Sequence, residues 1–161
     1  MSDEQIRRVW EGLLTSEILA NYFAELANGY HRRQRLTTWA ALVLSSGTLV
    51  SLLLSVPDNW VWLRPFLALL TAGISAYSVA VQNQKLATDS ADLYAKWDKL
   101  ASEFQAIWEN VHADDALQRL FRCEETQREI SKAATAFPNR EKRMLKWQAY
   151  VEERHRASAT A

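Results

Sequence analysis

The chain has 161 residues with equal numbers of basic and acidic side chains, so its formal net charge at pH 7 is zero. This length leaves room for a helical hairpin and one compact helical region, and it argues against a large catalytic core. The single cysteine, Cys123, excludes an intramolecular disulfide and is typical of a reducing, cytosolic environment.

Residues 1–35 are predicted to form cytoplasmic amphipathic helices, because their apolar side chains recur at helical spacing. The pattern is broken near Gly12, and Thr15 or Ser16 is the candidate N-cap of a second helix. We therefore expect a short helix followed by a longer one.

A basic run, Arg32, Arg33 and Arg35, closes this region. We expect these side chains to contact anionic lipid headgroups, and a nucleotide phosphate is the less favoured alternative.

Two uncharged stretches follow, Leu36–Val56 and Pro65–Val81. A bilayer core of about 30 Å needs roughly 17 to 25 apolar residues per helical crossing. We therefore predict an all-α membrane protein with a transmembrane hairpin at residues 36–81, whose crossings are 36–56 and 60–81. Basic residues flank the outer ends, which predicts a multi-pass membrane protein with both termini in the cytoplasm; the resemblance described below implies that this membrane is the bacterial inner membrane. Arg64 would reach the headgroups from the connecting loop.

Small and hydroxylated side chains form a stripe on each predicted crossing. The stripe of the first is a candidate pore lining and includes Thr38, Ser45, Thr48, Ser51 and Ser55. The second repeats a small residue every four positions, at Ala72, Ala76 and Ala80, as candidates for helix packing. Such stripes either pack helices closely or line a narrow aqueous path, and both interpretations stay open.

Residues 82–157 are predicted to form a cytoplasmic helical bundle, followed by a flexible tail at 158–161. Its strongest signal is a coiled-coil-like spacing of threes and fours. This spacing predicts a seam that packs within the bundle or against another subunit, formed by Leu86, Leu93, Trp97, Leu100, Phe104, Ile107 and Val111. Asp114 and Asp115 are suited to cap the next helix, and Pro138 is expected to end it.

The sequence carries no recognisable catalytic, metal or cofactor motif. His31, His112 and His155 lie in different segments without a second ligand at metal-binding spacing. The glycines form no phosphate-binding loop, and the Ser, Cys and His residues make no nucleophile motif. We therefore expect no enzyme activity, no metal and no cofactor.

The order of three features resembles the SLATT family of bacterial two-transmembrane effectors. These features are the segment Tyr30-His31-Arg32-Arg33, the tight hairpin, and a long helix that begins Gln82-Asn83-Gln84-Lys85-Leu86. The resemblance covers roughly residues 15–115 and also rests on Tyr22, Trp97 and Phe104. It implies that hairpins assemble into pores that permeabilise the inner membrane when a nucleotide-generating or nucleotide-sensing partner detects infection, as in anti-phage defence.

Two hypotheses of function follow. In the first, the chain is an oligomeric pore-forming effector, since two helices alone cannot enclose a channel. In the second, it is a membrane-anchored adaptor without channel activity, whose cytoplasmic helices bind a partner protein. The expected partners are the lipid bilayer, further copies of the chain and a nucleotide-signalling or sensor protein, and no nucleic acid is expected.

Overall fold

The computed structural model describes residues 1–45, 65, 69, 72–73, 77 and 83–159. The helices of the described residues are α1 (Asp3–Ser45), α4 (Asn83–Glu109), α5 (Ala116–Ala134) and α6 (Glu141–Ala159). They belong to two compact units. Unit 1 comprises Met1–Leu26 and Asp89–Ala161, and unit 2 comprises Ala27–Thr88.

Helix α1 is continuous through Gly12, so the predicted break into a short and a long helix is wrong. Gly12 meets a packing requirement: a Cβ atom there would lie 2.5 Å from Cζ of Phe104, far inside van der Waals contact. The missing side chain thus lets the Phe104 ring pack against the backbone of α1. Ser16, a predicted N-cap, lies inside this helix and is fully buried.

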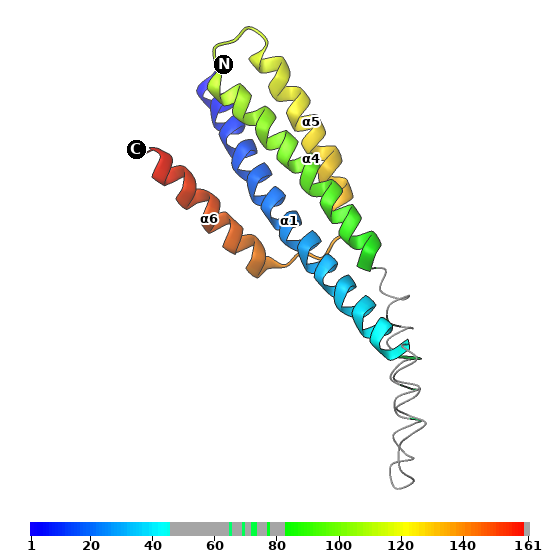
Figure 1. Cartoon of the computed structure of the whole chain (residues 1–161). Coiled ribbons are helices and arrows are strands. Elements are labelled where there is room, and N and C mark those ends of the chain that lie inside the picture. Colours follow the sequence, from blue (N-terminus) through cyan, green and yellow to red (C-terminus); the bar gives the residue numbers. More distant parts are fainter. Residues whose placement is uncertain (46–64, 66–68, 70–71, 74–76, 78–82, 160–161) are drawn as a thin grey trace. The chain divides into compact units, whose positions relative to one another are not determined.

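The core of unit 1 is built on α4, which runs beside α1 and α5 (Figure 1). Five of the predicted seam residues are at most 3% exposed within the single chain: Leu93, Trp97, Leu100, Phe104 and Ile107. Val111, beyond the end of the helix, and Leu86, in unit 2, are only partly buried. Repeated apolar side chains at this spacing give α4 one face that is removed from water, which is the main favourable contribution to folding.

Helix α5 begins after Asp115, which occupies the N-cap position but makes no side-chain capping hydrogen bond. The helix ends at Ala134, ahead of the predicted stop at Pro138. The connector that follows is held to α1, because the Tyr22 hydroxyl donates a hydrogen bond to the carbonyl oxygen of Pro138, and the backbone N–H of Arg140 donates to the Tyr22 oxygen over 3.3 Å. These contacts position the start of α6.

The predicted membrane architecture is not supported by the described residues. None of their helices combines the length and the apolar composition that a bilayer crossing needs. Within the described residues, the charge-free end of α1 covers residues 36–45 and directly follows the run that contains Arg32, Arg33 and Arg35. The rest of the first predicted crossing, and most of the second, lie outside the described residues.

This finding corrects the predictions that depended on the hairpin. The fold is described as all-α, without the predicted transmembrane helices. The predicted multi-pass location in the bacterial inner membrane and the membrane pore are corrected with it, because both require a helix that crosses the bilayer.

Candidate interaction surfaces

Helix α6 is held on α1 by a first polar cluster around Glu25. Oε2 of this carboxylate accepts hydrogen bonds from Nζ of Lys146 over 3.2 Å and from Nε1 of Trp147 over 2.8 Å. Nε of Arg143 lies 3.5 Å from the other oxygen, Oε1. Charge-assisted hydrogen bonds of this kind are stronger than neutral ones and fix the direction of both side chains.

Burial raises the pKa of the Glu25 carboxyl, but the hydrogen bonds from Lys146 and Trp147 and the charges of Lys146 and Arg143 lower it by more. The net pKa therefore lies below its ordinary value of 4.5. The folded protein thus favours the ionised carboxylate.

A second polar cluster surrounds Glu17. Oε1 accepts a hydrogen bond from the Arg154 guanidinium, and Oε2 lies 2.8 Å from Nε2 of His155. The rings of His155 and Trp10 form a T-shaped pair with their centroids 4.9 Å apart, and the centroid of the Trp10 ring lies 5.0 Å from that of Trp108 on α4. The end of α6 is thereby fixed to the start of α1.

The Glu25 cluster makes the stability of the α1–α6 contact depend on pH. Because the folded-state pKa lies below 4.5, the stabilisation is fully present above pH 4.5 and is lost as the pH falls through the lower, folded-state value. We expect the difference in unfolding free energy between the natural chain and Glu25→Gln to be constant above about pH 5.5 and to shrink at lower pH. Urea unfolding at a series of pH values measures it.

The matched control is Glu11→Gln, on the same helix, because the Glu11 carboxylate is exposed and lies 3.6 Å from Arg7 at a spacing of four residues. Its substitution is expected to change stability by less than about 0.5 kcal/mol at every pH. A Glu25→Gln difference that stayed the same from neutral to acidic pH would contradict this account of the cluster.

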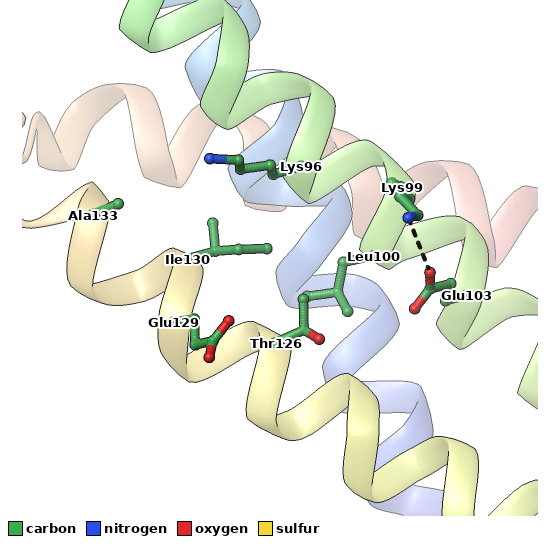
Figure 2. A pocket seen from close by; sticks show the side chains of 8 residues that line it. All are labelled: Lys96, Lys99, Leu100, Glu103, Thr126, Glu129, Ile130 and Ala133. Carbon is green, nitrogen blue, oxygen red and sulfur yellow. Dashed lines mark ion pairs between the residues drawn. The ribbon is translucent and has the colours of Figure 1, made fainter.

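A groove of about 310 Å³ lies between α4 and α5. Figure 2 shows Lys96, Lys99 and Glu103 on α4 facing Thr126 and Glu129 on α5 across this groove. Both lysines already have carboxylate neighbours on their own helix: Lys96 lies 2.7 Å from Asp92, and Lys99 lies 3.9 Å from Glu103. The groove therefore carries balanced charge and has no evident preference for an anion.

Cys123 on α5 is buried, and its Sγ lies 3.7 Å from Oε2 of Glu103 on α4. Burial, the Glu103 charge and the hydrogen bond to Glu103 raise the pKa of this thiol to about 11. Because the thiolate is the reactive form, Cys123 is expected to be chemically inert at neutral pH.

The described part of unit 2 exposes large apolar side chains on α1. Leu36, Trp39, Leu42 and Val43 are 54 to 73% exposed. Leu36, Trp39 and Val43 follow one another at steps of three and four residues, which places them on one side of the helix. We call these four residues the apolar face of α1.

Few of the residues singled out in the predicted hairpin have described side chains. Arg32, Arg33, Arg35, Thr38 and Ala72 are exposed. Ser45 is the last residue of α1. The remaining candidates lie outside the described residues: Thr48, Ser51, Ser55, Arg64, Ala76 and Ala80.

Sequence reasoning missed Glu17 and Glu25 as contact residues. Their partners lie more than 110 residues away along the chain, so no local spacing connects them. Within the described residues there is also no group of three or more His, Cys, Asp or Glu side chains able to hold a metal ion.

Comparison with protein-family models, with curated proteins and with solved structures finds no match to this chain. The resemblance to the SLATT family therefore stays a prediction.

Proposed function

We propose that this chain is a helical adaptor that associates with further copies of itself through the apolar face of α1 and binds partner proteins through its helical unit. The exposure of Leu36, Trp39, Leu42 and Val43 carries the proposal. Contiguous exposed apolar side chains on one element mark an interaction site more often than an ordinary surface. The proposal assigns no reaction to the chain.

A second copy of the chain is the occupant that best fits this face. Leu36, Trp39 and Val43 have the spacing of alternate core positions in a coiled coil. Residues 36–45 also carry no charged side chain, so two copies of the segment meet without burying an unpaired charge. In contrast, five residues of the longer seam of α4 are already buried within unit 1.

Oxidative cross-linking of Trp39→Cys tests this proposal. Position 39 lies near the centre of the apolar face, so it should approach its own copy in a parallel or an antiparallel pair closely enough for a disulfide. The natural Cys123 does not compete, because it is buried and its thiol is protonated at neutral pH. We expect a species of twice the chain mass on non-reducing gels.

Leu145→Cys is the matched control, because Leu145 on α6 is 57% exposed, comparable with Trp39 at 66%. It should cross-link only at the slow rate of random collision. Equal rates for the two variants would show that the apolar face is not a specific interface and would overturn the proposal.

A further inference from the structure

A pocket of about 460 Å³ lies in unit 1, where the connector between α5 and α6 is held to α1. Its most deeply buried lining residues are Tyr22, Phe23 and Trp97, each at most 4% exposed. Ser131 and Thr135 also line it and are exposed, so solvent reaches the pocket from their side. We call this space the aromatic pocket. Its volume falls within the range of about 300 to 1,000 Å³ that is usual for small-molecule sites.

The lining of the aromatic pocket is uncharged. Among the residues that the structure describes, those that line it include no Asp, Glu, Lys or Arg side chain. In contrast, lysine and glutamate side chains line the groove between α4 and α5. An ionised ligand in the aromatic pocket would lose hydration without gaining a partner of opposite charge. The lining therefore favours an uncharged ligand.

Contacts within unit 1 fix the walls of the aromatic pocket. The rings of Tyr22 and Phe23 form a T-shaped pair with their centroids 5.3 Å apart, and those of Phe23 and Phe137 form another at 5.7 Å. The Tyr22 hydroxyl is occupied by its hydrogen bonds to the connector. Aromatic walls that are already fixed can pack against a flat ring at little further entropic cost. The pocket thus suits a ligand that contains an aromatic ring.

Trp97 supplies a hydrogen-bond donor that has no acceptor. Its side chain is 0% exposed, and its Nε1 atom has no hydrogen-bond partner among the described residues. A buried indole N–H usually finds a partner, because an unpaired donor that is removed from water destabilises the fold. Since Trp97 also lines the aromatic pocket, an acceptor atom of a bound molecule would satisfy this donor.

From these observations we infer that the aromatic pocket binds a small uncharged molecule with an aromatic ring and a carbonyl oxygen, and that this oxygen accepts a hydrogen bond from Nε1 of Trp97. The ring of the ligand packs against the rings of Phe23 and Phe137. The inference does not depend on the proposed self-association, because the apolar face of α1 belongs to unit 2 and the pocket to unit 1.

The test titrates the full natural chain with 2-acetylnaphthalene, an uncharged probe with a fused aromatic ring and one carbonyl group. The indole N–H resonance of Trp97, identified by its absence in Trp97→Phe, should move and then saturate, because the N–H gains an acceptor. NMR spectroscopy measures both the movement and the affinity. A Trp97 resonance that does not move up to the solubility limit of the probe would overturn the inference.

2-Naphthoate is the matched charged probe, because a carboxylate replaces the acetyl group on the same ring. It should bind at least about tenfold more weakly, since its charge finds no partner in the lining. Equal affinities of the two probes would contradict a site for uncharged ligands. Binding of 2-acetylnaphthalene that appears only when the protein is diluted would show that a second copy of the chain fills the pocket, and it would also overturn the inference.

Ala134→Leu tests where the probe binds, because Ala134 lines the pocket and a larger side chain there takes up part of its volume. We expect this variant to bind 2-acetylnaphthalene at least about tenfold more weakly, because the probe and the added carbon atoms compete for the same space. The matched control is Ala136→Leu, at an exposed position that is not part of the lining, and it should bind like the natural chain. Equal affinities of the two variants would place the probe elsewhere and overturn the inference.

Discussion

Phe104→Ala is expected to destabilise the protein by about 3 to 5 kcal/mol, the usual cost of removing a buried aromatic side chain and leaving a cavity. Phe104 is 1% exposed and packs against the backbone of α1 at Gly12. The substitution therefore removes a contact between the two helices as well as apolar burial. Urea unfolding followed by circular dichroism measures the change.

Phe121→Ala is the matched control for this substitution. Phe121 lies on α5 and is 54% exposed, so the same side chain is removed from a position that buries little apolar area. Its loss is expected to change stability by at most about 0.5 kcal/mol, as is usual for surface positions. Similar costs for the two variants would contradict the placement of Phe104 in the core.

Gly12→Val should destabilise the protein by about 3 kcal/mol, at the upper end of the range for overpacking a core. The added Cβ would lie 2.5 Å from Cζ and 2.6 Å from Cε1 of Phe104. The ring has little freedom to move away, because it is buried. The same unfolding measurement applies, and combining Gly12→Ala with Phe104→Leu should recover part of the loss that Gly12→Ala alone causes.

The chain contains its own control, because Gly29 lies on the same helix with no atom within 4 Å of an added Cβ. Gly29→Val should be neutral or slightly stabilising, since valine has the better helix propensity. If Gly12→Val were as well tolerated as Gly29→Val, then Gly12 would have no packing role and the close contact between Gly12 and Phe104 would be wrong.

Periodicity predicted the helical character of the chain and the residues of its core. The steps of three and four along α4 identified Leu93, Trp97 and Ile107, which the structure buries, because this spacing directly reflects the geometry of one helix face. A break was predicted near Gly12 because the apolar pattern is interrupted there and Thr15 or Ser16 could cap a new helix. In the folded protein α1 continues through Gly12, whose missing side chain makes room for the Phe104 ring.

Sequence patterns did not predict the contacts between α1 and α6. Glu17 and Glu25 are ordinary charged residues of an amphipathic helix, and only the fold brings them to α6. The predicted hairpin had a different difficulty. Hydropathy along the sequence does not show where a helix begins or ends. Helix α1 includes both the charged residues before Leu36 and the apolar segment that starts at Leu36. The prediction of a crossing relied on the length of the uncharged stretches and on the basic residues that flank them.

The central claim of this account is that the chain works as a self-associating helical adaptor. Native mass spectrometry of the full chain tests it most directly, because each chain contributes 18.5 kDa and the copy number follows from the mass. The account predicts a complex of two or more copies that dissociates when Leu36, Trp39 and Val43 are replaced by glutamine. A natural chain that remains monomeric at every concentration tested would contradict it.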